Sequence, residues 1–344
     1  MQHKGNMIAA NLSTALTQSL RTMGLAERDE DPHYIALAGG VSSDIWRADL
    51  RLGAVCVKRA LPKLRVQMDW FAPIERNQYE IAWFRAVAEI VPDAVPKVLG
   101  TDTVRGLFVM EYLPPESYRL WRTELRAGRA NTAIAGQIGR LLAQIHAATS
   151  CRADIAAMFP TDHIFHAIRL EPYFEATARK HPDLAAQLNR LVNTTAAVKH
   201  ALVHGDVSPK NILIGPVGPV FLDAECAWYG DPAFDLSFCL NHLMLKCLWT
   251  PKSASDFLRC FDAMYNTYVG GVTWEPPAVL EARAAALLPA LFLARVDGKS
   301  PVDYLTQEAD TSRVRRFGRL MIQNAPNRLA VIRHAWAKEL DLGE

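Results

Sequence analysis

The sequence lacks the cysteine and histidine spacings that mark zinc sites. None of its six cysteines belongs to a CxxC pair, and its ten histidines form no HExxH pattern. Most of the cysteines stand within apolar segments, which favours buried free thiols over disulfides or a structural metal.

The chain also lacks a dominant charge and a long apolar run. A net charge of +2 is too small to indicate a nucleic-acid partner. The sequence contains no run of about eighteen apolar residues, so it predicts no membrane span. Polar residues interrupt the apolar stretch 7–20, so we expect no signal peptide. These absences favour a cytoplasmic protein without a nucleic-acid or membrane partner. We expect either a monomer or a homodimer.

The chain does contain enough apolar residues for a large core. Of its 344 residues, 50% are hydrophobic. That is sufficient for one two-lobed unit or for two domains.

The stretch HGDVSPKN, residues 204–211, carries the strongest chemical signal. It contains His204, Asp206 and Asn211, and it lies between the apolar runs 201–203 and 212–214. The pattern predicts a short loop held between two strands. Phosphoryl transfer needs a carboxylate to orient an attacking hydroxyl and hard oxygen ligands for magnesium, which Asp206 and Asn211 could supply.

A second carboxylate pair follows the next apolar run. Residues 215–218 can turn the chain, and the run 220–222 ends in Asp223 and Glu225. A hairpin would then carry Asp223 back beside Asn211. The order and spacing therefore predict a kinase-type site with two metal ligands at one end of the hairpin.

These motifs resemble the aminoglycoside phosphotransferase family, a branch of the protein-kinase-like fold that phosphorylates small molecules. The resemblance rests on HGD at 204–206, Asn211, DAE at 223–225 and YGDPAFD at 229–235. The Asp-x-Glu form is also similar to methylthioribose kinase and to the choline and ethanolamine kinases. The resemblance implies an α+β, two-lobed protein-kinase-like fold, with a small antiparallel-sheet N-lobe and a large, mostly helical C-lobe. The implied boundaries are a helical extension at 1–30, the nucleotide-binding N-lobe at 31–110, a hinge at 111–115 and the C-lobe at 116–344.

The N-terminal region begins with a predicted helix. Ile8, Leu12, Leu16 and Leu20 share one helical face, which would pack on the small lobe or form a dimer contact. Strands are then predicted at 34–37, 45–52 and 55–58.

A glycine-bearing turn separates the first two of these strands. It contains Gly39, Gly40 and Ser42, and such turns let backbone N–H groups approach phosphate oxygens. Alternation along the third strand places Lys58 on the face opposite Val55 and Val57. In the family that is resembled, the matching lysine contacts the nucleotide phosphates.

A helix predicted over residues 73–90 supplies a partner for this lysine. Glu80 lies on its apolar face and would pair with Lys58, whereas Glu75 lies off that face. The alternative is that Glu80 bridges a surface arginine.

The hinge is also implied by the resemblance. Backbone groups of Glu111 and Leu113 would hydrogen-bond the purine, and Met110 would stand at the back of its pocket. Nothing in these residues separates ATP from GTP as the co-substrate.

Helices dominate the remainder of the chain. An apolar stripe from Ile134 to Ile145 predicts a core helix, and His146 at its end is expected to be a packing residue. By resemblance, Asp235 would hydrogen-bond the backbone of the catalytic loop, with Asp231 the less favoured candidate. The apolar helices predicted at 236–270 and 278–296 are expected to be core.

The resemblance assigns the chemistry as follows. Mg²⁺ would be held by Asn211 and Asp223, Asp206 would accept or orient the acceptor proton, and His204 would support the loop. Glu225 would either contact a second metal or support the glycine turn. The competing interpretation is a nucleotide-binding pseudokinase or regulator without turnover.

A small-molecule acceptor is expected. Residues 224–234 are too few for a peptide-binding activation segment, and Gly205 stands where protein kinases have an arginine. The basic segment 313–338 would favour a neutral or anionic acceptor if it lined the site, but it could equally be a solvated helix face. We therefore expect a sugar or an amino alcohol before an aminoglycoside. The turn at 295–301, with Arg295, Asp297 and Lys299, is a candidate for the acceptor side.

Overall fold

The computed structural model describes residues 2–37, 42–62 and 73–343, with side chains described from residue 12 onward. The chain divides into two compact units. Unit 1 comprises residues 1–85 and 96–114, and unit 2 comprises residues 86–95 and 115–344.

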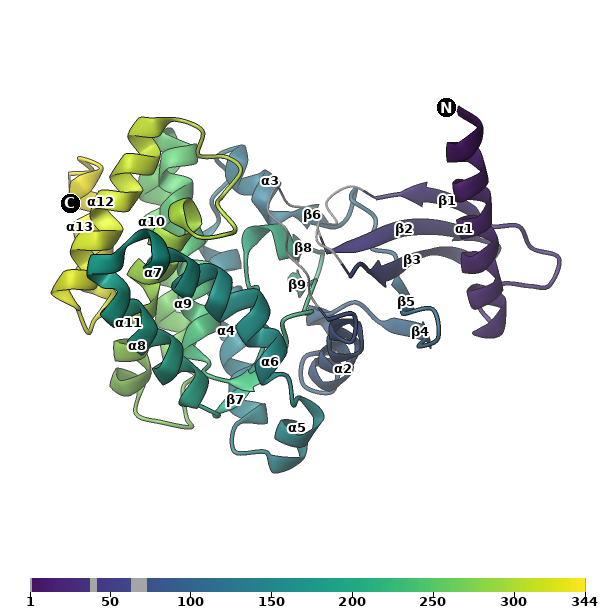
Figure 1. Ribbon diagram of the computed structural model, residues 1–344, viewed down its shortest axis with the longest axis horizontal. Coiled ribbons are helices and arrows are strands. Elements are labelled where there is room, and N and C mark those ends of the chain that lie inside the picture. Colours follow the sequence, from purple (N-terminus) through teal and green to yellow (C-terminus); the bar gives the residue numbers. More distant parts are fainter. Residues whose placement is uncertain (1, 38–41, 63–72, 344) are drawn as a thin grey trace. The chain divides into compact units, whose positions relative to one another are not determined.

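Unit 1 is built on a five-stranded antiparallel sheet with the strand order β1-β2-β3-β5-β4 (Figure 1). The predicted strands are all present, within a few residues of their expected ends. The elements are α1 (Gln2–Thr22), β1 (His33–Ala36), β2 (Ser43–Leu50), β3 (Gly53–Ala60), α2 (Arg76–Ala88), β4 (Val98–Asp102) and β5 (Leu107–Glu111).

Helix α1 covers one face of this sheet. Leu16 and Leu20 are buried against Val55, Val57 and Val109, so the predicted packing of the helix on the sheet is confirmed for these residues. The helix was expected to extend to residue 30 but ends at Thr22. The end is explained by Gly24, whose φ of +71° is the left-handed conformation that terminates helices.

Helix α2, which begins in unit 1, packs on the opposite face. Phe84 of α2 lies 6.3 Å from Phe108 of β5, measured between ring centroids. Lys58 also points to this side, where it meets Glu80 of α2. Strand alternation thus separates an apolar face under α1 from a face that carries a charged pair.

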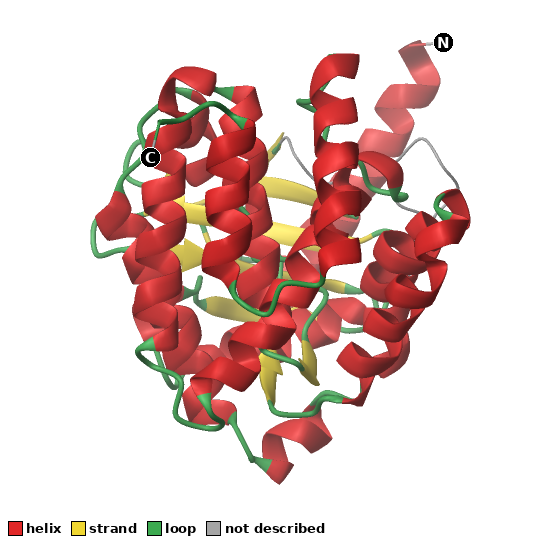
Figure 2. Ribbon diagram, turned by 90° about the vertical axis from the view of Figure 1, so that its left-hand side faces the viewer, coloured by secondary structure: helices red, strands yellow, loops and turns green. Residues whose placement is uncertain are grey.

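Unit 2 is mostly helical (Figure 2). Its helices are η1 (Pro92–Ala94), α3 (Trp121–Arg126), α4 (Thr132–Thr149), α5 (Ala153–Met158), α6 (Asp162–Phe165), η2 (His166–Glu175), α7 (Ala176–Lys180), η3 (Pro182–Leu184), α8 (Ala185–Ala197), η4 (Pro209–Asn211), α9 (Ala233–Trp249), η5 (Pro251–Ser253), α10 (Ala254–Val269), α11 (Pro277–Asp297), α12 (Glu308–Asn324) and α13 (Leu329–Glu339). Its strands are β6 (Arg119–Leu120), β7 (Ala201–Val203), β8 (Ile212–Ile214), β9 (Pro219–Phe221) and β10 (Trp228–Gly230).

Two apolar helices form the centre of unit 2. Helix α9 is buried along nearly its whole length, as expected of a core segment. Helix α11 is the one described helix that is long and apolar enough to cross a membrane, yet 67% of its most apolar window is buried inside the structure. Burial of this kind is what a core helix shows.

The loop 204–211 is held between two strands, as predicted. Strand β7 precedes it and pairs with β10, while β8 follows it and pairs with β6 and β9. The flanking strands therefore belong to different small sheets. Five of the six free cysteines are buried, and Cys151 is exposed.

Candidate active site

Asp235 anchors the loop that carries the HGD motif. Its two carboxylate oxygens accept hydrogen bonds from the backbone N–H groups of His204 and Gly205, each at 2.8 Å. These are the contacts that the resemblance implied for Asp235. His146 lies 3.2 Å from the same carboxylate and 2.8 Å from the Tyr268 hydroxyl, so this buried histidine braces Asp235.

Gly205 allows the loop to pass close to the chain that follows the DAE motif. Its φ is +77°, and a Cβ at this position would lie 2.7 Å from the carbonyl oxygen of Cys226. Both the backbone conformation and the lack of space therefore require glycine. The close approach brings the HGD and DAE segments together.

Asp206 is buried and surrounded by donors. Arg169 Nη2 lies 3.0 Å from its Oδ2, and Lys210 Nζ lies 3.2 Å from the same oxygen. The Asn211 amide donates to Oδ2 at 2.9 Å and to the Asp206 carbonyl at 3.1 Å. The structure thus brings the predicted base and the predicted metal ligand Asn211 into direct contact.

Charge holds Asp206 in its ionised form. Burial alone would raise its pKa, but the neighbouring Lys210 and Arg169 outweigh burial and hold the pKa below its usual range. Asp206 and Asp223 in turn raise the pKa of Lys210, whose side chain is exposed. The carboxylate is therefore an anion that can orient a hydroxyl.

Arg169 was not among the predicted site residues. It lies in the π-helix η2, where it is 6% exposed, and its Nε donates to the Gly205 carbonyl at 2.5 Å. Its guanidinium also lies over the rings of Tyr173 and Phe238. No local motif marks it, because its partners are distant in sequence. Lys210, in contrast, stands within the loop motif and could have been found there.

His204 supports the loop through hydrogen bonds. Its Nε2 donates to the Leu222 carbonyl at 3.1 Å, and its Nδ1 accepts from the Asp206 N–H at 3.1 Å. This pattern fixes a neutral imidazole, and burial accordingly lowers its pKa. The ring ties the HGD loop to the end of the hairpin.

Asp223 lies just beyond the end of β9. This strand pairs with β8, which begins directly after Asn211. Residues Ile212 and Phe221 are paired, and the Leu222 N–H donates to the Asn211 carbonyl at 2.8 Å. Asp223 then adopts a φ of +64°. Asp223 and Glu225 are both half-buried. Within the described ranges, no three His, Cys, Asp or Glu side chains are grouped as a preformed metal site.

Unit 1 contains the second charged pair. Lys58 Nζ lies 2.7 Å from Glu80 Oε1, and both residues are buried. Glu75 is exposed, so the choice between the two glutamates matches the observed pairing. Gly39 and Gly40 lie outside the described residues. Ser42 is buried, and its carbonyl accepts a hydrogen bond from Arg76 at 2.7 Å.

The predicted hinge residues lie at the end of β5. Met110 is buried opposite Cys56 of β3, and Leu113 is half-buried. The Glu111 N–H donates to the Lys97 carbonyl at 2.9 Å. Any purine contact from Glu111 would therefore come from its carbonyl group.

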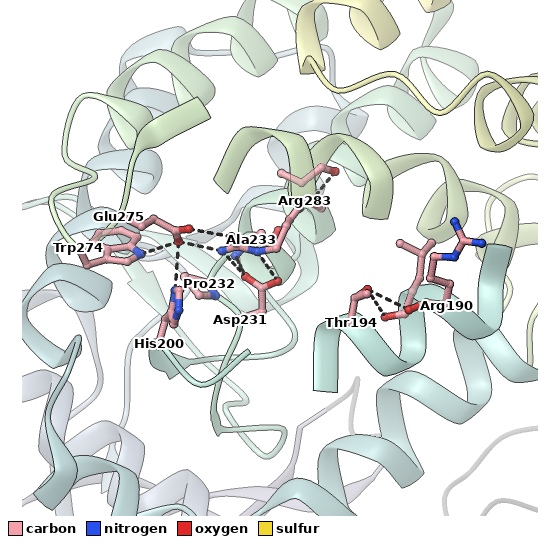
Figure 3. A network of polar contacts seen from close by, with 12 residues as sticks. Arg190, Thr194, His200, Asp231, Pro232, Ala233, Trp274, Glu275 and Arg283 are labelled. Carbon is pink, nitrogen blue, oxygen red and sulfur yellow. Dashed lines mark hydrogen bonds and ion pairs between the residues drawn. The ribbon is translucent and has the colours of Figure 1, made fainter. Parts of the chain in front are cut away.

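Asp231 belongs to a different network (Figure 3). It accepts hydrogen bonds from Arg283 at 2.9 and 3.0 Å, and the same guanidinium binds Glu275. Glu275 in turn contacts His200 and Trp274. Asp231 thus holds α11 to the start of α9, and the contacts of its carboxylate are with Arg283 and the Ala233 N–H instead of the HGD loop.

The turn at 295–301 contains three charged side chains. Two of them form ion pairs, and the third, Arg295, has no carboxylate partner among the described residues. Asp297 contacts His181 and Arg315 at 2.9 and 2.8 Å, and Lys299 contacts Glu171 at 2.8 Å. Arg295 has no carboxylate partner within the part of the chain that the structure describes; its Nη1 donates to Tyr173 and Ser300.

The basic segment 313–338 does not form a field of free charge. Arg319 pairs with Asp183 at 2.7 Å and Arg333 with Asp262 at 2.9 Å. Arg316 pairs with Glu339. These pairs neutralise much of the positive charge of the segment. The segment therefore does not indicate whether the acceptor is anionic, neutral or cationic.

Known proteins match more than half of this chain in sequence. The model of the phosphotransferase enzyme family matches residues 33–246. The methylthioribose kinase of Yersinia enterocolitica is 27% identical over 232 residues, which cover 59% of this chain and 57% of that protein. The methylthioribose kinase of Erwinia tasmaniensis is 27% identical over 234 residues, covering 59% and 58%. The matched region is thus little more than half the length of these relatives.

Solved structures show the same fold. A choline/ethanolamine kinase family protein from Mesorhizobium loti has a TM-score of 0.53 at 15% identity, covering 93% of this chain and 98% of that one. The ethanolamine kinase of Plasmodium vivax has a TM-score of 0.51 at 13% identity, covering 88% and 83%. Together with the antiparallel sheet of unit 1 and the helical unit 2, these likenesses confirm the predicted α+β protein-kinase-like fold.

Proposed function

Because this chain belongs to the phosphotransferase enzyme family, we propose that it is a small-molecule kinase that transfers the γ-phosphoryl group of ATP to a hydroxyl group. The observation that carries the proposal is the environment of Asp206. This buried carboxylate is held by the amide of Asn211, on a loop anchored by Asp235. A carboxylate fixed in this way meets the need of phosphoryl transfer to orient an attacking hydroxyl.

Asn211 and Asp223 are the proposed ligands of Mg²⁺, with Glu225 as a second contact or a brace for the glycine turn. The donor set fits the ion, because magnesium prefers carboxylate and carbonyl oxygens. The amide nitrogen of Asn211 donates to Asp206, so its oxygen is the atom left for a cation. When bound, Mg²⁺ would neutralise charge on the nucleotide phosphates.

The nucleotide is assigned to residues of unit 1. Lys58, held in place by Glu80, is proposed to neutralise the phosphates. The glycine turn and the hinge are proposed to bind the phosphates and the purine, respectively. The remaining residues in this assignment are Gly39, Gly40, Ser42, Met110, Glu111 and Leu113.

In the proposed reaction, the acceptor hydroxyl oxygen attacks the γ-phosphorus. The bond between that phosphorus and the bridging oxygen to the β-phosphate breaks, and ADP leaves with the bond's electron pair. The hydroxyl proton passes to the Asp206 carboxylate. Asn211 and Arg169 hold this carboxylate, so the protein contributes mainly position and charge.

An Asp206→Asn variant tests the assignment and also addresses the pseudokinase alternative. Asparagine keeps the size of the side chain but removes its charge. We expect ADP release with a panel of hydroxyl compounds to fall by a factor of about 100 or more, with ATP affinity nearly unchanged. Asp154→Asn, which changes an exposed carboxylate on α5, is the matched control. Full activity in Asp206→Asn would overturn the assignment, and a wild-type protein that binds ATP without any turnover would favour the pseudokinase.

A further inference from the structure

Unit 2 contains a group of basic and aromatic side chains that make none of the contacts described above for the HGD loop. We call it the basic cluster and define it by Arg122, His242, Lys246, Arg295 and Tyr304. Its members come from α3, α9, α11 and the turn after α11. Because these segments are far apart in sequence, only the tertiary fold brings them together.

Lys246 is the central member of the basic cluster. It is 1% exposed, and its Nζ lies 3.9 Å from the ring centroid of Trp249 and 3.7 Å from that of Tyr304. No carboxylate lies within ion-pair distance of it among the described residues. Burial and the nearby Arg122 lower its pKa to about 6. A buried amine in this setting is stabilised by an anion.

Other polar atoms of the basic cluster are also without partners. His242 Nε2, Arg295 Nε and the Tyr304 hydroxyl are buried and have no hydrogen-bonding partner in the described parts of the chain. Buried polar groups are normally hydrogen-bonded, so several such atoms in one cluster point to a polar ligand.

The charge of the cluster defines the kind of ligand. Arg295 is 8% exposed and has no carboxylate within reach among the described residues. Arg122 pairs with Asp303 at 2.8 Å, but this carboxylate is 69% exposed. Arg126 adds a further cation over the Trp249 ring. Three guanidinium groups and one carboxylate therefore lie beside the rings of Tyr173, Trp249 and Tyr304, so positive charge is in excess.

A shared aromatic ring, that of Tyr173, connects the basic cluster to the arginine that binds Asp206. The guanidinium of Arg169, which binds Asp206, lies 5.6 Å from the Tyr173 ring centroid. The guanidinium of Arg295 also lies 5.6 Å from this ring. The arginine that binds Asp206 and an arginine of the basic cluster therefore contact the same ring, so the cluster neighbours the proposed catalytic loop.

We propose that the basic cluster binds an anionic group of the acceptor, a carboxylate or a phosphate ester, while the acceptor hydroxyl meets Asp206. This inference rests on the proposed kinase function and names its substrate class. Lys246 and Arg295 pair with the anion, and Tyr304 and His242 complete its hydrogen bonds. The cluster disfavours cationic acceptors, because the Arg122 guanidinium and the Lys246 amine already lie over the rings that would receive an ammonium group.

Acceptor sets matched in shape and different in charge test the proposal. Glycerate, glycerol and serinol form one set, and gluconate, sorbitol and glucamine form another. Glycerol 3-phosphate and glucose 6-phosphate distinguish a phosphate ester from a carboxylate. Binding is measured by calorimetry without nucleotide, and transfer by ADP release. We expect an anionic member to bind about tenfold or more tightly than its neutral counterpart, and the cationic member to be the weakest.

The variants Lys246→Met and Lys252→Met test whether the preference for anionic acceptors depends on Lys246. Methionine retains much of the lysine shape, and Lys252 is an exposed lysine on η5. Lys246→Met should raise KM for the anionic acceptor about tenfold with little change in kcat, whereas Lys252→Met should match the wild type. If no anion binds better than its neutral counterpart, or if Lys246→Met binds anions normally, the proposal is wrong. Anion binding without ADP release would support the site and overturn the kinase function instead.

Discussion

Arg169 and Asp206 form a buried ion pair, with Nη2 and Oδ2 3.0 Å apart. The arginine comes from the π-helix η2 and the aspartate from the loop between β7 and β8, so the pair joins two distant parts of unit 2. Arg169 also binds the carbonyl of Gly205. Arg169 therefore fixes the backbone position of the proposed catalytic carboxylate and, together with Lys210, favours its charged form.

Arg169→Met should weaken this arrangement in a pH-dependent way. The pKa of Asp206 is depressed in the folded state, so the pairing stabilises the protein above the ordinary aspartate pKa and is lost as the pH falls through the folded value. Without Arg169 this pKa rises, and the acidic limb of the pH profile of kcat/KM should move to higher pH. We expect the free energy of unfolding to fall by about 3 kcal/mol at neutral pH, because Lys210 still faces the carboxylate.

The control for this change is Arg179→Met. Arg179 of α7 forms an ion pair with Glu171 of η2, and its side chain is exposed. Loss of a surface pair should change the unfolding free energy by less than about 1 kcal/mol and leave the pH profile unchanged. An unshifted acidic limb in Arg169→Met would show that Arg169 does not set the charge of Asp206.

Gly205→Ala should be far more damaging than Gly24→Ala. Both glycines have left-handed φ values, +77° and +71°. A Cβ at position 24 meets nothing within 4 Å, whereas at position 205 it lies 2.7 Å from the Cys226 carbonyl. Gly24→Ala should therefore lose only about 1–2 kcal/mol of stability. Denaturant unfolding and ADP release should show a larger loss for Gly205→Ala, with activity reduced because Asp206 is displaced; equal effects would contradict this interpretation.

Asp235→Asn should reduce turnover in a folded protein. Its carboxylate accepts two backbone N–H groups, and an amide oxygen can replace only one of these acceptors. The unsatisfied N–H should lower stability by about 1–3 kcal/mol and loosen the HGD loop. Asp231→Asn, in the network with Arg283, is the matched control because it lowers stability without touching that loop. Circular dichroism establishes folding for both variants, and a kcat equally reduced in both would count against the anchoring role of Asp235.

The sequence predicted those parts of the site that depend on local patterns. The strand–loop–strand order around residues 204–211 and the alternation that places Lys58 opposite Val57 need only short-range information. The pairing of Lys58 with Glu80 also followed, because a carboxylate on an apolar helix face requires a cation.

The parts that depend on tertiary structure were missed. Arg169 lies in a π-helix that contains Pro172, and nothing near it in the sequence indicates its partner Asp206. Lys246 stands within an apolar helix that was expected to be core, and its environment includes Arg122 and Tyr304 from distant segments. The predicted basic segment 313–338 was a poor guide to the acceptor, because carboxylates elsewhere in unit 2 pair with its arginines.

Lys246→Met should stabilise the free protein, in contrast to the usual effect of a buried substitution. Burial and Arg122 lower the lysine pKa from 10.5 to about 6, so between these values the unfolded chain binds a proton that the folded chain does not. Stability therefore rises with pH across that window, and the wild type is penalised at pH ~7. Methionine removes the penalty and keeps contact with the rings. Thermal unfolding should show a higher Tm at neutral pH, a gain that shrinks toward pH ~10, and no gain for Lys252→Met; an unchanged or lower Tm at neutral pH would mean that Lys246 is charged and already compensated in the folded protein.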